Sequence, residues 1–138
     1  MIAGGGERVT LRLVAQYADA CNIMDAPEVL ARKYATLARH CEIVGRNYSS
    51  IKRTATTLVI IRDTDEAARA LVPSGIDFAY PGDVGTYGLV GTIDTIERRI
   101  AAFADAGVQE LALGFENPTS VDQIRQFADV FIRQPVQI

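Results

Sequence analysis

The stretch Ile2-Ala3-Gly4-Gly5-Gly6-Glu7 decides how the beginning of this chain folds. Three successive glycines can adopt backbone conformations closed to other residues, so a tight turn here can direct several N–H groups into one concavity. A helix is expected after the turn, because Leu11, Val14, Ala15 and Ala18 recur at the spacing of one helical face. A strand, a glycine turn and a helix N-terminus form an anion-binding geometry, so we predict a phosphate cradle. The alternative is that the glycines only make a tight strand-to-helix turn.

Strands and helices alternate along the rest of the chain. Residues 54–61 form the clearest strand, because they are β-branched and nearly continuously apolar at their end, as in a parallel strand buried on both faces. Right-handed crossovers make the four expected strands a parallel α/β sheet, and four βα units are half of a (β/α)8 TIM barrel. We take residues 1–138 as a single domain. The expected strands are residues 1–3, 20–24, 54–61 and 108–115, and the expected helices are residues 8–18, 25–44, 63–72, 91–107 and a last helix capped by Thr119 or Ser120.

An open sheet of four parallel strands would leave two edges unpaired and one face without a covering layer. We therefore expect the chain to associate with itself or with a complementary N-terminal half-barrel.

Residues 74–91 interrupt the alternation of strands and helices. They are rich in Gly, Pro and Tyr and have no sustained periodicity, which indicates a long excursion of the kind that often carries binding function. The right-handed connection predicts that this segment lies on the same face as the glycine turn, where Tyr80 and Tyr87 could cover a coenzyme or a partner.

The composition excludes several classes of partner. Of the 138 residues 49% are hydrophobic and 22% are charged, and the net charge of −3 comes from basic residues scattered among acidic ones. We expect no nucleic-acid or anionic-membrane surface from this pattern. No apolar run is long enough to span a bilayer, and the first residues lack the features of a signal peptide, so a cytoplasmic location is expected.

The side chains with reactive chemistry do not form a recognisable catalytic set. Cys21 and Cys41 lack metal-ligand spacing and lie in apolar patterns, so we expect buried free thiols and no metal site. His40 is expected on a helix surface. Met24 and Asp25 follow the second strand, at the end where barrel enzymes place their sites, and we name them as residues that could face substrate.

The opening residues also resemble a known family. The run Ala3-Gly4-Gly5-Gly6-Glu7, the helix from Thr10, and Tyr17-Ala18-Asp19-Ala20-Cys21-Asn22 resemble the glycine turn, helix and A-x-x-A-D-G-x-N strand in the second half of luciferase-like monooxygenases. The branch that uses the deazaflavin coenzyme F420 is the most similar. Later segments agree in order, and the resemblance covers residues 2–132.

The resemblance implies a TIM barrel whose C-terminal face binds a small-molecule substrate and coenzyme F420 for hydride transfer. The alternative within the family is an FMN-dependent monooxygenase. It assigns the coenzyme phosphate to Gly4, Gly5 and Gly6, with Glu7 and Thr10 flanking. This chain would supply strands five to eight of the barrel. The family's catalytic acid or base and most of its ring-binding residues lie on earlier strands, so the catalytic residues stay unassigned and we expect the chain alone to be inactive. A non-catalytic half-barrel that binds a phosphate ligand or self-associates is the alternative from another class.

Overall fold

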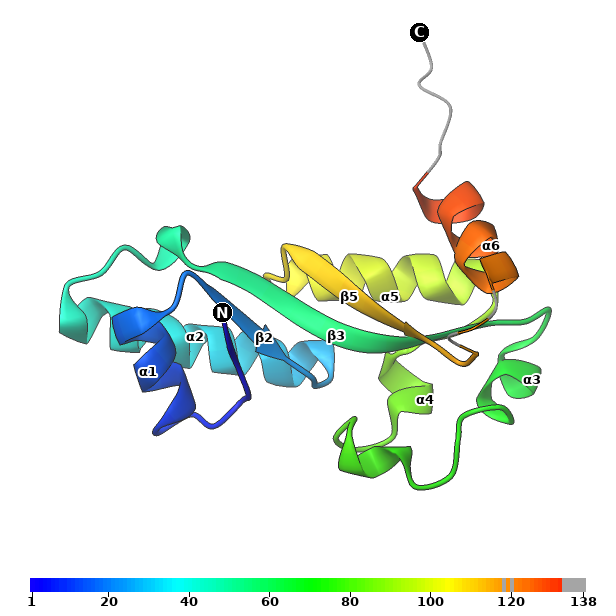
Figure 1. Ribbon diagram of the computed structural model, residues 1–138, viewed down its shortest axis with the longest axis horizontal. Helices are drawn as coiled ribbons and strands as arrows, with labels where there is room; N and C mark the ends of the chain where they lie inside the picture. Colours follow the sequence, from blue (N-terminus) through cyan, green and yellow to red (C-terminus); the bar gives the residue numbers. More distant parts are fainter. Residues whose placement is uncertain (118, 120, 133–138) are drawn as a thin grey trace, which may run out of the picture.

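The chain folds into one parallel sheet with helices packed along it (Figure 1). The structure is a computed structural model and describes residues 1–117, 119 and 121–132. Its strands are β1 (Ile2–Ala3), β2 (Ala20–Ile23), β3 (Lys52–Ile61), β4 (Leu89–Gly91) and β5 (Glu110–Phe115). Its helices are α1 (Thr10–Tyr17), α2 (Pro27–Val44), α3 (Asp65–Arg69), α4 (Val84–Tyr87), α5 (Ile93–Asp105) and α6 (Val121–Phe131), with 3₁₀ turns at Tyr48–Ser50 and Ile76–Phe78.

Strand β3 is the centre of the sheet. It pairs in parallel with β2 over its first residues, with β4 over its last three, and with β5 from Thr54 to Val59. Strand β1 pairs only with β2 among the described strands. The run of β-branched and apolar residues in β3 is buried almost throughout, as the sequence predicted for a central parallel strand.

The predicted α/β architecture is confirmed, and one strand was missed. All four expected strands form and are parallel, with β1 reduced to two residues and one further bond from the Gly4 N–H to the Asn22 carbonyl. The short strand β4 lies at the end of the excursion, residues 74–91, which the sequence analysis treated as irregular. Three residues between glycines carry too little periodicity to predict a strand, and the pairing with the end of β3 creates it.

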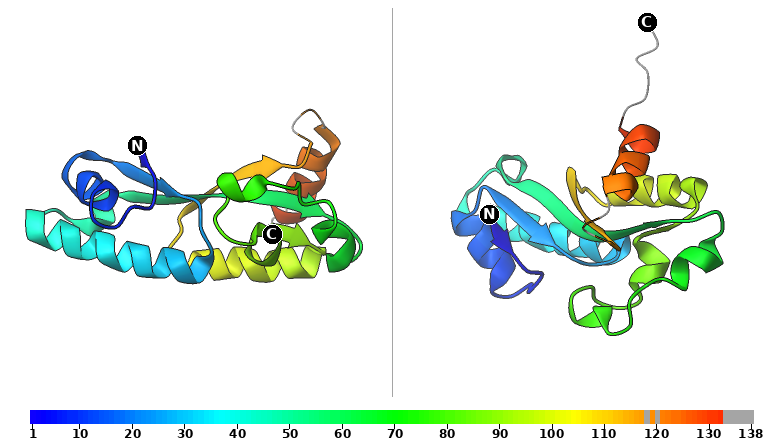
Figure 2. Two further views of the ribbon diagram at one scale, coloured as in Figure 1. Left: turned by 90° about the horizontal axis from the view of Figure 1, so that it is seen from below. Right: turned by 45° about the vertical axis from the view of Figure 1, so that its right-hand side comes forward.

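Helices α2 and α5 lie along one face of the sheet (Figure 2). Helix α6 packs on the same strands through Phe127, whose ring meets Phe115 edge-on at 6.1 Å. Side chains alternate along a strand, so the residues in register with Phe115, such as Val59 and Leu89, point to this face. The largest fully buried side chains are Phe103, Leu11, Ile23, Leu30, Leu37, Ile51, Ile60, Leu89, Ile96, Val14, Val59 and Val84.

The opposite face of the sheet is polar at its middle. Asn22 and Thr54 lie side by side in register; the Asn22 amide donates to the Thr56 hydroxyl at 2.9 Å, and the Thr54 hydroxyl lies 2.9 Å from the Asn22 Oδ1. Farther along, the Tyr80 hydroxyl lies 2.8 Å from the position that a Cβ on Gly114 would take. The excursion therefore covers part of this face, which in a closed barrel would be the interior.

The helix ends are capped in different ways. Asp25 and Glu28 have the spacing of a capping box, but Ala26 is the N-cap of α2 and no side chain caps it. Gly45 ends α2 in the left-handed conformation, with φ of 69°. The Thr119 hydroxyl and backbone N–H both bond to Asn117, and the alternative cap Ser120 lies outside the described residues.

The two thiols are buried and free, as predicted. Burial raises the pKa of the Cys21 thiol, which keeps it protonated and unreactive at neutral pH. Within the described residues, no helix is long and apolar enough to cross a bilayer.

Asp65 joins the short helix α3 to the start of α5. Its Oδ1 accepts the Thr92 backbone N–H at 2.8 Å, and its Oδ2 accepts the Thr95 hydroxyl at 2.9 Å. These hydrogen bonds lower the pKa of the Asp65 carboxyl below its ordinary value. The carboxylate thereby fixes where α5 begins after β4.

We expect replacement of Asp65 with Asn to lower the urea midpoint of unfolding at pH 7. The folded-state pKa of Asp65 is depressed, so its contribution is present above the unfolded pKa and is lost as pH falls through the folded pKa. The difference between the wild type and Asp65→Asn should therefore shrink below about pH 4. Replacement of the exposed Asp105 with Asn is the matched control and should change little at either pH. A difference that persists unchanged at pH 2 would contradict this account.

Candidate functional site

All strands of the sheet are parallel, so their carboxyl ends meet at one edge. The glycine turn follows β1 at this edge, Met24 and Asp25 follow β2, and Arg62 follows β3. Open parallel sheets and (β/α)8 barrels bind their ligands at this edge. The sequence-predicted site residues therefore follow β1 and β2, whereas β3 continues for six residues beyond Ala55, its last pairing with β2.

The three glycines of the turn differ in what disfavours a side chain at each position. Gly4 has φ of 121°, a conformation that other residues rarely adopt. A Cβ on Gly5 would lie 2.5 Å from the Lys33 Nζ and 3.1 Å from Ile23, and a Cβ on Gly6 would lie 2.9 Å from the Thr10 hydroxyl oxygen. Gly4 is favoured by its backbone conformation, whereas a side chain at Gly5 or Gly6 would have to displace a neighbouring side chain.

The glycine turn leaves backbone donors available. Among the described residues, no acceptor is found for the N–H groups of Gly5 and Gly6. The N–H of Leu11, in the first turn of α1, is taken by the Gly6 carbonyl at 3.0 Å. Any anion at this turn would therefore bind the glycine N–H groups rather than the Leu11 N–H.

Side chains of helix α2 contact the glycine turn and the Glu7 residue that follows it. The Glu7 carbonyl accepts from His40 Nε2 at 2.8 Å, which places the proton of that imidazole on Nε2. The Glu7 carboxylate lies 3.3 Å from the Arg32 Nε, and the Lys33 ammonium lies beside Gly5. His40, expected as a plain surface residue, instead fixes the peptide plane that leads from the turn into α1.

The two residues named as substrate-facing have different environments. The Met24 side chain is partly exposed at the edge of the sheet. The Asp25 carboxylate is mostly buried: its Oδ2 lies 2.8 Å from the Lys33 Nζ, and its Oδ1 accepts the Ala26 N–H at 3.0 Å. The Asp25 side chain is therefore held by protein groups on both oxygens.

The excursion ends on the carboxyl side of the parallel sheet, the side on which the glycine turn follows β1, as predicted. Gly91 is paired with Ile61 at the carboxyl end of β3, and its carbonyl accepts the Arg62 N–H at 3.1 Å. Tyr87 is 9% exposed and donates its hydroxyl proton to the Pro81 carbonyl at 2.9 Å. Burial, followed by the negative charge of Asp25, raises the pKa of Tyr87 to about 12. Tyr87 is thus packed near the Asp25 side chain and stays neutral.

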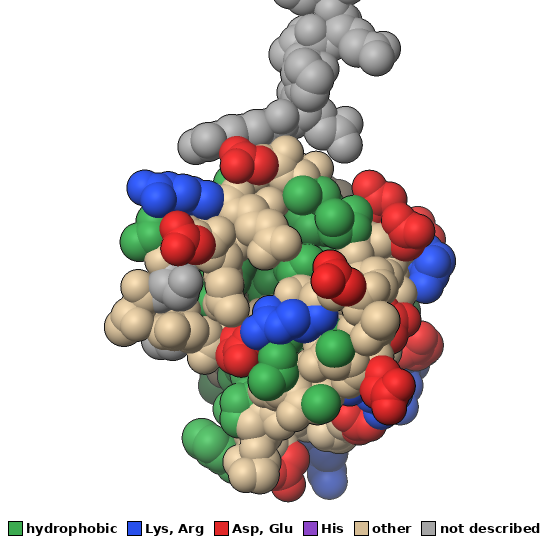
Figure 3. Space-filling view, turned by 90° about the vertical axis from the view of Figure 1, so that its right-hand side faces the viewer, with side chains coloured by type: hydrophobic (Ala, Val, Ile, Leu, Met, Phe, Trp, Pro, Cys, Tyr) green, Lys and Arg blue, Asp and Glu red, His purple; other side chains and the backbone are tan. Residues whose placement is uncertain are grey.

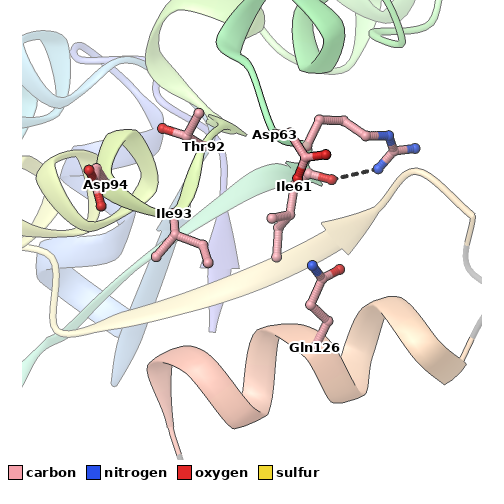
Figure 4. A pocket seen from close by; sticks show the side chains of 7 residues that line it. Ile61, Asp63, Thr92, Ile93, Asp94 and Gln126 are labelled. Carbon is pink, nitrogen blue, oxygen red and sulfur yellow. Dashed lines mark hydrogen bonds between the residues drawn. The ribbon is translucent and has the colours of Figure 1, made fainter.

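A separate cleft of about 670 Å³ lies at the ends of β3 and β4 (Figure 4). Its lining residues are Ile61, Arg62, Asp63, Thr92, Ile93, Asp94 and Gln126. The Arg62 guanidinium is already paired with Glu116 at 2.8 Å, and two carboxylates face the cleft. This charge balance disfavours a phosphate in this cleft. The face of the molecule in Figure 3 likewise carries acidic and basic side chains next to each other.

The sequence analysis missed Lys33 and His40 as neighbours of the glycine turn. A usable signal was present, because the two side chains are seven residues apart and flank the apolar stripe of α2 that contains Leu37 and Cys41. Residues seven apart lie on one helix face. Nothing in the sequence stated which loop that face would meet.

Comparison with solved structures finds similar folds. The chain superposes on an F420-dependent secondary alcohol dehydrogenase in complex with an F420-acetone adduct, with a TM-score of 0.70, 19% identity, and coverage of 93% of this chain and 46% of that one. The superposition on coenzyme F420-dependent tetrahydromethanopterin reductase from Methanopyrus kandleri has a TM-score of 0.62 and 15% identity, and it covers 89% of this chain and 46% of that one. The superposition on the oxygenating constituent of 3,6-diketocamphane monooxygenase from Pseudomonas putida, in complex with FMN, has a TM-score of 0.57 and 19% identity. It covers 80% of this chain and 40% of that one.

These likenesses establish the fold. The chain has the α/β fold of part of a luciferase-like TIM barrel, as the sequence resemblance predicted, and spans less than half the length of each structure named above. No protein-family model matches the chain, and a comparison with curated protein sequences gave no match.

We expect replacement of Gly5 with Val to weaken phosphate-dependent coenzyme binding. The backbone at Gly5 tolerates a side chain, but the added carbons would displace the Lys33 ammonium and crowd Ile23. Overpacking of this kind costs about 1–3 kcal/mol, so the fold should survive. Fluorescence titration with coenzyme, together with thermal unfolding, measures both effects. Ala35→Val, at an exposed position of α2, is the control. Unchanged affinity in Gly5→Val would remove the turn from the site.

Proposed function

We propose that this chain is the C-terminal, coenzyme-phosphate-binding part of an F420-dependent oxidoreductase. The observation that carries the proposal is the superposition of nearly the whole chain on less than half of an F420-dependent alcohol dehydrogenase. The glycine turn supports it, because it lies at the carboxyl edge of the sheet where parallel α/β proteins bind ligands.

The residues at the turn fit a phosphate. The N–H groups of Gly5 and Gly6 have no acceptor among the described residues, and the Lys33 ammonium lies beside Gly5 and the Thr10 hydroxyl beside Gly6. A phosphate offers several acceptor oxygens and a negative charge, and such donors match both. Glu7 would stay outside the anion's contacts, because its carboxylate points to Arg32 and its carbonyl to His40.

The bound deazaflavin would exchange a hydride with the substrate. This chain's part in that reaction is to fix one end of the coenzyme and to line one side of the site. Hydride transfer requires the ring and the substrate in near-attack geometry, which one phosphate anchor does not provide. The part of the chain that the structure describes contains no assembled nucleophile, base and orienting group, so the groups that act on the substrate would come from the remainder of a barrel.

Two other functions differ from this one by measurable properties. An FMN-dependent monooxygenase would use the same turn, since FMN also carries a phosphate and a tricyclic ring, and one of the similar structures contains FMN. A non-catalytic half-barrel would bind phosphate without preference for either coenzyme.

We expect the purified chain to bind F420 or FMN and to catalyse no hydride transfer alone. Fluorescence titration with F420, FMN and riboflavin tests the binding, because riboflavin has the ring of FMN without the phosphate. FMN should bind at least about tenfold more tightly than riboflavin if charge-assisted bonds to the phosphate dominate. Equal affinity for FMN and riboflavin would contradict phosphate anchoring. Turnover of F420 by a monomer of this chain would contradict the proposal that the groups acting on the substrate come from the remainder of a barrel.

We further propose that a complementary N-terminal half-barrel, or a second copy, packs against the flanks of this chain. Helix α1 buries Leu11, Val14 and Ala15 but exposes Val9, Leu13 and Tyr17 at every fourth position, with Tyr17 75% exposed. Helix α6 likewise exposes Val121 and Ile124. Helix α1 lies next to β1, which has β2 as its only partner among the described strands, whereas α6 packs on β5, which pairs with β3. Apolar stripes beside an unpaired edge support docking at both flanks.

We expect the double variant Leu13→Glu, Tyr17→Glu to abolish this association. Sedimentation velocity should give a concentration-dependent increase in mass for the wild type and a monomer for the variant. Phe78→Glu, which alters an exposed apolar residue outside α1 and α6, should associate as the wild type does. A wild type that stays monomeric alone and with an added N-terminal half-barrel would refute the docking proposal.

A further inference from the structure

We propose that Lys33 supplies the positive charge for a phosphate group at the glycine turn, and that Asp25 holds its ammonium in place until the phosphate binds. This inference deepens the proposed function and depends on it only for the identity of the molecule that carries the phosphate.

Position is the first argument. Lys33 lies in α2, yet its ammonium reaches the turn that follows β1, 2.5 Å from where a Cβ of Gly5 would be. Gly5 does not have a positive φ, so its missing side chain serves to admit the ammonium and Ile23 rather than to relieve the backbone. The glycine and the lysine therefore belong to one arrangement.

Donor count is the second argument. An ammonium carries three N–H donors, and the Asp25 Oδ2 at 2.8 Å is the single hydrogen-bond acceptor found for Lys33 among the described residues. The N–H groups of Gly5 and Gly6 have no acceptor among those residues. The Thr10 hydroxyl oxygen lies 2.9 Å from where a Cβ of Gly6 would be. Backbone, hydroxyl and ammonium donors thus lie at two successive glycines, and a tetrahedral anion with several acceptor oxygens matches donors of these kinds.

Burial is the third argument. The side chains of Lys33 and Asp25 are only 15% and 13% exposed. Removing two charges from water costs free energy that the pair regains only in part, so a mostly buried ion pair is weak support for a stabilising role. An anion that binds beside Lys33 would attract this buried charge, and ligand binding would then account for its presence.

The chain contains its own control. Its only other lysine is Lys52, which pairs with Glu110 at 2.6 Å. That pair is 56% and 58% exposed and lies at the starts of β3 and β5, the opposite end of the sheet. The two lysines therefore have the same type of partner, and only Lys33 has a glycine turn beside it.

The test is an NMR titration of the full chain with inorganic phosphate, at constant ionic strength set with sodium chloride. We expect the amide signals of Gly5 and Gly6 to shift with phosphate. Lys33→Met should weaken the apparent affinity by about tenfold, the effect of losing one charge-assisted hydrogen bond. Asp25→Asn should strengthen the affinity severalfold, because the ammonium then lacks its counter-ion. Lys52→Met should bind as the wild type does.

The directions of the two variants separate a ligand from a merely structural pair. If the pair only supports the fold, Lys33→Met and Asp25→Asn should both weaken binding, and that result would overturn the proposal. Wild-type signals of Gly5 and Gly6 that ignore phosphate would also overturn it. If Lys33→Met does not fold, Asp25→Asn decides the matter by the sign of its effect. Phosphate binding with the expected pattern, but no binding of F420 or FMN, would sustain the role of Lys33 and reject the proposed coenzyme.

Discussion

The parallel ladder of β3 is the interaction on which the rest of this molecule depends. One ten-residue strand pairs with β2, β4 and β5, so the elements before and after it are held in one sheet. Its side chains are buried on the helix-covered face by α5 and α6 and on the other face in part by the excursion. β-branched residues fit this doubly covered position because their packing, more than any intrinsic backbone preference, stabilises strands.

Parallel pairing has a functional consequence. Because all strands point the same way, every loop after a strand emerges at one edge, and residues far apart in sequence become neighbours there. Glu7 and His40 are 33 positions apart and share a hydrogen bond. The same geometry brings Asp25 close to Tyr87, whose pKa responds to the Asp25 charge.

Contacts with helix α2 hold the glycine turn in one conformation. Glycine costs conformational entropy on folding, so three in a row need compensation from their surroundings. Helix α2 provides this compensation: Arg32 pairs with the Glu7 carboxylate, His40 bonds to the Glu7 carbonyl, and the Lys33 ammonium lies beside Gly5. A backbone fixed in this way can present N–H groups to an anion without reorganising when the anion binds.

The parallel α/β sheet, the apolar face of each long helix and the position of the glycine turn are predictable from the sequence. These features depend on periodicity and on single-residue conformational limits, such as the positive φ of Gly4 and Gly45, which act within a few neighbouring residues. Long-range packing is needed to form β4, to begin α2 at Pro27 with no side-chain cap, and to bring Lys33 beside Gly5. Each of these depends on a partner distant in sequence: β4 needs the end of β3, and Lys33 needs a turn 28 positions before it. Local patterns carry no record of such partners, because long-range packing selects among arrangements that the local sequence permits equally.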